Sequence, residues 1–306
     1  MMTAAVALSD LRAVLGDQVE EHVRLAPYTS ARIGGPADVL VTARSADELA
    51  HAVQFCWQHA LGFHLLGAGS NLLVSDKGVR GVVLLNKARS VEFVEGAEPS
   101  VWAESGVIFS NLARRAAAQG LAGLEWAATV PGTVGGAVYG NAGAFGGDVA
   151  HDLLAAEVLT PAGREWWPVE RMEYGYRTSL FKRGLAQAVI LAAKFNLKNG
   201  RAEDIQTTID QLNARRKATQ PPGASMGSMF KNPPGDYAGR LLEAAGLKGT
   251  RIGSAEISTV HGNFFLNTGE TRAADIKALI ELAQKTVKEK FGVQLELEVE
   301  LLGEWE

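Results

Sequence analysis

A short glycine-rich loop, Gly67-Ala-Gly-Ser-Asn-Leu72, is the first segment of this chain whose residue types could bind a phosphorylated ligand. Successive backbone N–H groups in such a loop can form an anion-binding nest, although an ordinary hairpin turn is the favoured interpretation of this segment taken alone. The two leading glycines resemble the start of a dinucleotide fingerprint. Because the third glycine is absent and Leu72-Leu-Val74 continues like a strand, a Rossmann domain is disfavoured. No Gly-Lys dipeptide occurs, which excludes a Walker A loop.

A second candidate is Gly223-Ala-Ser225-Met-Gly227, which matches the nucleophile-elbow pattern of serine hydrolases. An elbow needs a strand before the serine and a helix after it, whereas Pro-Pro pairs stand on both sides of this segment. Asp236 and His261 follow in triad order, which chance supplies easily. A hydrolase that uses Ser225 is therefore an alternative, and a disfavoured one.

The cluster most like a metal site is His51, Cys56 and His59, and its spacing matches no ligand set. The three residues fit one amphipathic helix as core or surface positions, so we predict no metal. Cys56 is the only cysteine, which excludes an internal disulfide and fits a reducing compartment.

The charge balance gives no global basic field, because the net charge is −4 at pH 7. Binding of nucleic acid or of an anionic membrane surface is therefore not expected. A local basic group, Arg215-Arg216-Lys217, precedes a proline-rich loop and could hold phosphates or simply complement a helix C-terminus. The N-terminus lacks a basic region followed by an apolar one, so we expect no signal peptide and a cytoplasmic protein.

Glycine is over-represented, with 34 in 306 residues, and seven of these lie between Pro131 and Gly147. The same region contains a charge-free run of 22 residues, Trp126 to Gly147, which is long enough to span a bilayer. Its glycines, together with Pro131 and Asn141, dilute the apolar content too far for a membrane helix.

The elements that must position these segments form an α+β pattern. A capping box, Ser45-Ala-Asp-Glu48, predicts a helix with Leu49, Val53 and Trp57 on one face. Apolar periodicity predicts further helices over residues 108–119, 203–217 and 271–291, the last closed by Gly292. Strands are predicted over 63–66, 82–86, 91–94, 156–160, 165–169, 188–195 and 293–301, and an irregular segment over 220–235.

Six motifs occur along the chain in a fixed order, and together they identify a family. They are Arg32-Ile-Gly-Gly-Pro-Ala37, Gly67-Ala-Gly-Ser-Asn-Leu72, Val130-Pro-Gly-Thr-Val-Gly-Gly136 with Asn141-Ala-Gly143, Gly175-Tyr-Arg-Thr-Ser179, Gly227-Ser-Met-Phe-Lys-Asn-Pro233 and Glu296-Leu-Glu-Val299. The chain resembles, over nearly its whole length, the UDP-N-acetylenolpyruvoylglucosamine reductases, flavoenzymes of bacterial cell-wall synthesis. It is most similar to the branch of the family that lacks an extra substrate-covering loop.

The resemblance implies an α+β fold with an FAD-binding region of the vanillyl-alcohol-oxidase type, followed by a smaller α+β substrate-binding domain. Residues 1–80 and 81–200 would form two FAD-binding subdomains, and residues 201–306 the substrate domain. Glycine suits such a role because main chain without a Cβ can approach a planar ring or a phosphate. The residues that the resemblance assigns to non-covalent FAD are Arg32, Ile33, Gly67, Ala68, Gly69, Ser70, Asn71, Leu72, Pro131, Gly132, Thr133, Gly136, Asn141 and Ala142.

The implied reaction uses NADPH as hydride donor and reduces the enolpyruvyl double bond of a UDP-linked sugar. Negative charge then develops at C2 and its carboxylate, which calls for a cation and a proton donor. The resemblance assigns these catalytic roles to Arg177, Ser228 and Glu298. Only the motif selects Glu298, because Glu296 and Glu300 share the predicted strand face. The residues assigned to the nucleotide substrate are Tyr176, Lys231 and Asn232, with Arg216 and Lys217 as weaker candidates.

Departures from the family pattern are also visible. Glu104 stands where the family more often has a glycine-alanine pair, which would place an uncompensated carboxylate near the flavin. Val260-His261 replaces a more typical lysine-histidine pair. The alternatives to a reductase are a non-catalytic flavin-binding module and an oxidase on the same flavin fold.

Overall fold

The computed structural model describes residues 11–305 and divides the chain into two compact units. The first unit comprises residues 11–21, 39–67 and 81–214 of the described chain, and the second comprises 22–38, 68–80 and 215–305. The second unit thus combines residues 22–38 and 68–80 with the C-terminal residues, an arrangement that no sequence pattern indicates. The three-part division at residues 80 and 200 stays a prediction. The expected absence of a signal peptide concerns residues that lie partly outside the described range.

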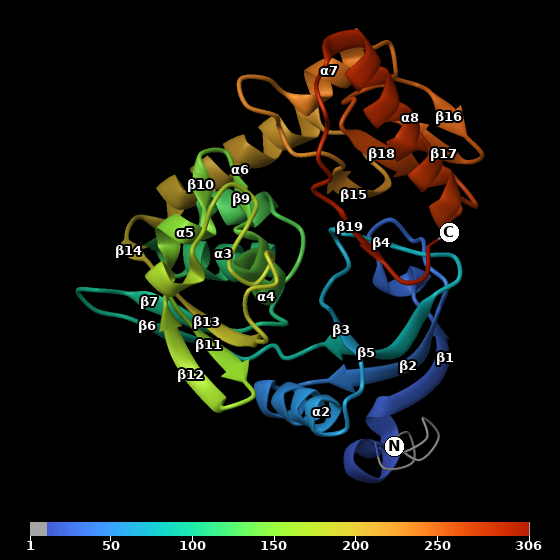
Figure 1. The fold of residues 1–306 in the computed structure, drawn as a ribbon. Coiled ribbons are helices and arrows are strands. Elements are labelled where there is room, and N and C mark those ends of the chain that lie inside the picture. Colours follow the sequence, from blue (N-terminus) through green and yellow to red (C-terminus); the bar gives the residue numbers. More distant parts are fainter. Residues whose placement is uncertain (1–10, 306) are drawn as a thin grey trace. The chain divides into compact units, whose positions relative to one another are not determined.

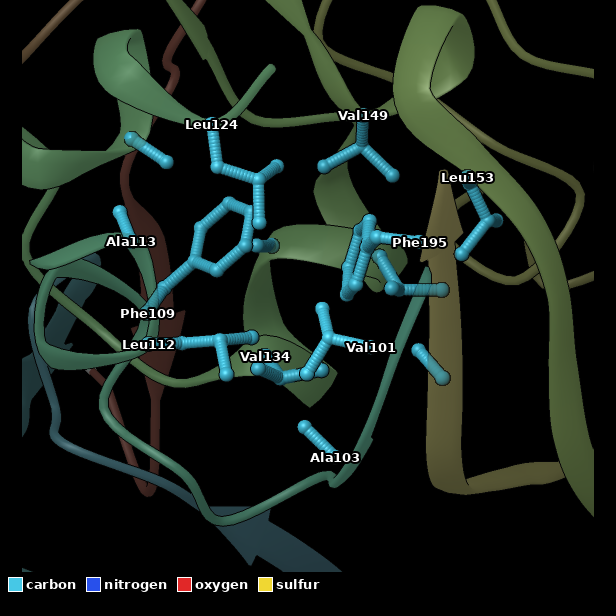
Figure 2. Packing of buried hydrophobic residues seen from close by; sticks show 14 of the residues in the cluster. Val101, Ala103, Phe109, Leu112, Ala113, Leu124, Val134, Val149, Leu153 and Phe195 are labelled. Carbon is cyan, nitrogen blue, oxygen red and sulfur yellow. The ribbon is translucent and has the colours of Figure 1, made fainter. Parts of the chain in front are cut away.

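A five-stranded antiparallel sheet is the main sheet of the first unit, with strand order β12-β11-β13-β7-β6 (Figure 1). Its strands are β6 (Val91–Val94), β7 (Ser100–Glu104), β11 (Leu153–Thr160), β12 (Gly163–Pro168) and β13 (Val189–Asn196). Helix α3 (Phe109–Ala118) packs its apolar face into the same core, where Phe109 and Phe195 lie with ring centroids 5.3 Å apart (Figure 2). Five of the predicted elements, the helix over 108–119 and four strands, are thereby confirmed.

A second core in the first unit forms around helix α2 (Ala46–Gln58). Strand β3 (Phe63–Leu66) pairs in parallel with β5 (Val79–Asn86), and α2 buries Leu49 and Val53 while Trp57 stays half-buried. The Ser45 hydroxyl accepts the Glu48 N–H at 3.1 Å, which confirms the predicted helix start. Cys56 is fully buried, and burial raises the pKa of its thiol to about 11.

The glycine-rich, charge-free run is divided among four short elements. They are η3 (Glu125–Thr129), α4 (Val134–Gly140), β9 (Gly143–Ala144) and β10 (Gly147–Asp148), and the short helix α5 (Val149–Asp152) follows the run. Thr133 caps α4 by accepting the Gly136 N–H at 3.3 Å. Within residues 11–305 no helix combines the length and the apolar content that a bilayer crossing requires.

The second unit contains a four-stranded antiparallel sheet of order β15-β18-β17-β16. Its strands are β15 (Ala224–Ser228), β16 (Arg251–Ile252), β17 (Ala255–Ile257) and β18 (Phe264–Asn267). Helices α7 (Ala238–Ala244) and α8 (Ala273–Phe291) share its core, and Figure 1 shows α8 along the sheet. Gly292 ends α8 in the left-handed conformation, as predicted. Strand β4 (Leu72–Val74) pairs in parallel with β19 (Glu300–Leu302).

The remaining elements connect these parts of the chain. The chain passes between the units within β1 (Val19–Arg24), β2 (Pro36–Ala43), β5 and the helix α6 (Ala202–Thr219), and also between Gly67 and Ala68. Short strands β8 (Leu121–Ala122) and β14 (Lys198–Asn199) pair with each other. The first unit also contains the 3-10 turns η1 (Gly16–Gln18) and η4 (Val169–Met172), and the second unit contains η2 (Ala26–Tyr28).

Two predictions about the C-terminal half were wrong. The segment over 220–235 is not wholly irregular, because Ala224–Ser228 forms β15. The strand predicted over 293–301 is regular only at Glu300–Leu302. Apolar residues alternate with polar ones over this segment, which predicts burial of Leu295, Val299 and Leu301. Leu295 and Val299 are buried, but Leu301 is exposed and Leu302 is buried instead. The parallel pairing with β4 begins at Glu300 and sets the burial of its last residues.

Candidate active site

The two glycines of the loop Gly67–Leu72 each lie too close to neighbouring atoms for a side chain to fit. A Cβ on Gly67 would lie 2.6 Å from the Thr133 hydroxyl, and one on Gly69 would lie 2.4 Å from the Tyr28 carbonyl oxygen. Gly69 also has a φ of +58°. No backbone N–H of residues 68–71 donates a hydrogen bond to another residue within the described part of the chain. These four donors are therefore available to an anion, as the nest interpretation of the loop requires.

Within the segment from Pro131 to Ala142, Gly136 and Gly140 lie four residues apart on one face of α4 and place no side chain there. Val134 on the opposite face lies in the core beside Val101 (Figure 2). Gly136 is exposed, and the one described atom within 4 Å of a Cβ built on it is the Thr133 hydroxyl, at 3.6 Å. Pro131 is also exposed, whereas Thr133 is buried. The exposed glycine face can accommodate a flat ring against the main chain.

The glycines between Pro131 and Gly147 do not all serve the same purpose. A Cβ on Gly135 would lie 2.8 Å from the Ser105 Cβ, and one on Gly147 would lie 2.3 Å from the Trp126 ring. These two glycines are required by neighbouring protein atoms. Gly136 differs from them because protein atoms leave its Cβ position open.

The other predicted cofactor residues are placed as follows. Arg32 is exposed with a φ of +57°, while the Ile33 side chain is buried in the core of the second unit. Gly132 has a φ of +111°, and its carbonyl accepts the Phe109 N–H. The Ala142 N–H and carbonyl are both used in backbone hydrogen bonds. The Ile33 N–H donates to the Thr29 hydroxyl at 3.1 Å, and the Ile33 carbonyl accepts from that hydroxyl at 2.9 Å.

A β-bulge places Ser228 at the end of β15. The register shifts between Ser225↔Leu266 and Ser228↔Phe264, so β15 carries one extra residue, and Gly227 there has a φ of +77°. Met226 and Met229 are both buried, whereas Ser228 between them is half-buried. A regular strand would place residues 226 and 228 on one face. The bulge therefore turns the Ser228 side chain out of the methionine core.

Glu298 lies beside the same strand end. Phe230 and Leu297 form an antiparallel bridge, and the Glu298 N–H donates to the Met229 carbonyl at 2.9 Å. The Glu298 carbonyl accepts the Asn71 side-chain amide at 3.0 Å. Within the second unit the structure therefore brings together the strand end that carries Ser228, the backbone of Glu298 and the end of the glycine loop.

Arg177 belongs to the first unit and occupies a tight turn. The Thr178 N–H donates to the Gly175 carbonyl, and the Gly175 N–H donates back to the Thr178 carbonyl. The Arg177 guanidinium donates to the Gly143 carbonyl at 2.6 Å. The neighbouring Tyr176 ring is exposed, and its centroid lies 5.4 Å from the Arg177 guanidinium carbon.

The predicted nucleotide-binding residues differ in their surroundings. Lys231 lies 3.4 Å from the Glu296 carboxylate, which is largely exposed. The Asn232 side chain accepts the Ala238 N–H at the start of α7. Arg216 and Lys217 lie in the last turn of α6, where partial burial lowers the pKa of Arg216. Lys217 is exposed.

The hydrolase alternative is contradicted by the structure around Ser225. This residue lies inside β15 rather than at a strand-to-helix turn, and the next described helix begins at Ala238. Asp236 pairs with Arg240, and the His261 Nδ1 accepts the Asn263 N–H. These interactions join neither Asp236 nor His261 to Ser225, and they do not join Asp236 to His261.

Two site-supporting residues were missed or misread from the sequence. Asn263 is only 3% exposed, and its side-chain amide pairs with both the N–H and the carbonyl of Phe230. Glu104 is not uncompensated, because its two carboxylate oxygens each accept a backbone N–H, from Ala46 and Ser90, at 2.7 Å. Glu104 therefore helps to cap α2. Both are contacts between residues distant in the sequence, which no local pattern indicates.

Comparison with known proteins agrees with this arrangement. Residues 37–167 match the model of an FAD binding domain, and residues 217–302 match the C-terminal domain of UDP-N-acetylenolpyruvoylglucosamine reductase. A relative of that name from Chloroflexus aggregans is 46% identical, and the match covers 90% of this chain and 94% of the relative. One from Halalkalibacterium halodurans is 41% identical, and the match covers 97% and 98% of the two chains.

A solved structure agrees as well. The crystal structure of UDP-N-acetylenolpyruvylglucosamine reductase (MurB) from Thermus caldophilus is 36% identical to this chain, with a TM-score of 0.80. The match covers 93% of this chain and 98% of that one. The predicted class, an FAD-binding α+β region followed by a smaller C-terminal α+β domain, is confirmed. The chain belongs to the UDP-N-acetylenolpyruvoylglucosamine reductase family.

Proposed function

We propose that this chain reduces UDP-N-acetylglucosamine enolpyruvate to UDP-N-acetylmuramate with NADPH, a cytoplasmic step in peptidoglycan precursor synthesis. Family membership supports the FAD-dependent reductase activity and the UDP-linked substrate. The observation that supports the catalytic assignment best is the bridge between Phe230 and Leu297, which places the Glu298 backbone next to the strand end that carries Ser228.

The residues fit FAD by two tests of the structure. The loop over residues 68–71 offers four N–H groups without protein acceptors among the described residues, which suits a diphosphate. The exposed face at Gly136 leaves open the space that a Cβ would fill. When bound, FAD supplies the redox chemistry that links NADPH oxidation to hydride delivery at C3 of the enolpyruvyl group.

The protein residues then have separable tasks. Arg177 offers a planar guanidinium, which suits the substrate carboxylate through two parallel hydrogen bonds. Ser228 donates a proton to C2, where negative charge develops once hydride has reached C3. Glu298 orients the reacting groups beside Ser228. Tyr176, Lys231 and Asn232 contact the nucleotide, with Arg216 and Lys217 as further candidates for its phosphates.

The test separates the two half-reactions by anaerobic stopped-flow absorbance. In Ser228→Ala, NADPH should bleach the bound flavin at the wild-type rate, whereas reoxidation by the enolpyruvyl substrate should slow by about 10²–10⁴-fold. Ser225→Ala is the matched control, since Ser225 lies on the same strand and should leave both rates unchanged.

Three outcomes would contradict the proposal. Equal slowing of both half-reactions in Ser228→Ala would contradict the role of Ser228 as proton donor. A protein that binds FAD but does not turn over would be a flavin-binding module. Reoxidation by oxygen that is faster than reoxidation by the substrate would indicate an oxidase.

A further inference from the structure

The turn that carries Arg177 has a backbone conformation that an arginine rarely adopts. Among its four residues, Gly175 to Thr178, Arg177 alone has a positive φ, at +54°. A positive φ at the third position is the pattern of a type II turn, and that position is usually glycine. Such a conformation persists at a functional site only where surrounding contacts enforce it.

The guanidinium of Arg177 is part of what enforces it. Nη2 donates to the Gly143 carbonyl at 2.6 Å, and Nη1 lies 3.5 Å from the Asn141 carbonyl oxygen. Gly143 has no space for a side chain here, because a Cβ would lie 3.2 Å from Arg177 Nη1 and 2.8 Å from the Asp148 Cβ. The segment 141–143 thus forms a fixed surface against which the arginine rests.

Asn141 joins this surface to the turn through its side chain. It is 5% exposed and ends α4 with a φ of +48°. Its Nδ2 donates to the Gly175 carbonyl at 3.0 Å, and its Oδ1 accepts the Ala150 N–H at 3.0 Å. Both ends of the amide are therefore engaged by backbone groups of the same unit, which leaves the side chain poorly suited to bind a cofactor.

Two further hydrogen bonds tie the same two segments together. The Tyr174 hydroxyl donates to the Val138 carbonyl at 2.8 Å, and the Ser179 hydroxyl donates to the Tyr139 carbonyl at 2.5 Å. They lie on either side of the turn, whereas Asn141 bonds the turn itself. Asn141 is thus the side chain that fixes the turn's first residue.

We infer that Asn141 is a positioning residue that holds the Gly175–Thr178 turn in its strained form, so that the Arg177 guanidinium is oriented for the substrate carboxylate. This inference rests on the proposed role of Arg177 in substrate binding. It gives the Asn141 side chain a role other than the FAD contact that the resemblance implies for this residue. Its consequence is specific, since loss of the amide donor should weaken use of the enolpyruvyl substrate and leave flavin binding intact.

The test uses Asn141→Asp, which keeps the size, the tolerance of a positive φ and the acceptor for Ala150, but removes the donor to Gly175. In the FAD-loaded enzyme, reoxidation by the enolpyruvyl substrate should slow at least tenfold at subsaturating substrate, or its KM should rise at least tenfold. The FAD Kd and the rate of reduction by NADPH should stay within twofold of the wild type. Hydrogen exchange of the Thr178 N–H should become faster.

Asn199→Asp is the matched control, because Asn199 lies in the same unit, is exposed and donates to the Gly96 carbonyl away from the turn. It should leave all four measurements unchanged. If Asn141→Asp does not fold, Asn141→Gly keeps the left-handed backbone and should show the same substrate defect.

A double-mutant cycle decides whether Asn141 acts through Arg177. Arg177→Ala alone should slow reoxidation, and Asn141→Asp should then add no more than a twofold effect. Independent, multiplicative effects, or a loss of FAD affinity in Asn141→Asp, would overturn the inference while leaving the function of Arg177 in place. Normal reoxidation by Arg177→Ala would instead refute the proposed role of Arg177, and the inference with it.

Discussion

Adding a methyl group at Gly136 should stabilise the protein without cofactor and weaken its binding of FAD. Gly136 lies within helix α4, and the described atom nearest to an added Cβ is the Thr133 hydroxyl, at the ordinary contact distance of 3.6 Å. Alanine is a better helix former than glycine by about 0.5–1 kcal/mol. The free energy of unfolding of the FAD-free Gly136→Ala variant should therefore rise by about that amount, as measured by urea denaturation.

The same methyl group should reduce FAD affinity if the exposed face of α4 lies against the flavin. Overpacking by one methyl group against a rigid partner costs about 1–3 kcal/mol. This corresponds to an increase in Kd of roughly 5- to 150-fold, which flavin fluorescence quenching during titration of the FAD-free protein can resolve. The two effects have opposite signs, so a general loss of folding cannot imitate the result.

Gly67→Ala provides the contrasting case. Its Cβ would lie 2.6 Å from the hydroxyl of the buried Thr133, so the protein without cofactor should lose about 1–3 kcal/mol of stability. Gly62→Ala is the control, because Gly62 has no described atom within 4 Å of its Cβ position, and it should not affect FAD binding. Unchanged FAD affinity in a stabilised Gly136→Ala protein would refute our reasoning about the exposed face.

Three other perturbations have defined outcomes. Glu104→Gln replaces one of the two buried carboxylate oxygens that accept N–H groups with an amide donor. The free energy of unfolding, measured by urea denaturation, should therefore fall by about 1–3 kcal/mol. An unchanged value would contradict the role of Glu104 in capping α2. Gly227→Ala introduces a side chain at a φ of +77°, which should cost about 1–2 kcal/mol and, by distorting the bulge, slow flavin reoxidation by substrate more than flavin reduction by NADPH. The Arg240 guanidinium lowers the pKa of Asp236 from 3.8 to about 2, so its carboxylate contributes stability above pH 3.8 that is lost as the pH falls toward 2. The stability difference between wild type and Asp236→Asn should shrink over that pH range, and NMR titration of the carboxyl carbon should give a midpoint near 2.

Elements with a strong local signal were predictable from the sequence. The capping serine of α2 and the terminal glycine of α8 marked helix ends that the structure confirms. Each of these signals depends on hydrogen bonds or backbone angles within a few residues. The order of the six motifs identified the family for a different reason, since it compares the chain with relatives rather than with physical rules.

Features that depend on distant contacts were not predictable in the same way. The alternation over residues 293–301 predicts a strand, but regular pairing is limited to Glu300–Leu302 because β4 supplies the partner only there. Strand β15 lies in a segment rich in proline and glycine, and its pairing with β18 and its bulge define it. Glu104 looked like an unpaired charge because its two N–H donors lie 58 and 14 residues away.

The glycine excess illustrates what the sequence can predict and what only the structure shows. Composition alone cannot distinguish a glycine that neighbouring protein atoms require from one that leaves space for a ligand, because both lack the same Cβ. Gly135 and Gly147 are of the first kind, since a Cβ on either would overlap Ser105 or Trp126. Gly136 is of the second kind, because its Cβ position is open and exposed. A substitution at the first kind should therefore reduce the stability of the protein without cofactor, whereas one at Gly136 should weaken cofactor binding without that loss, and this difference is measurable before any substrate is added.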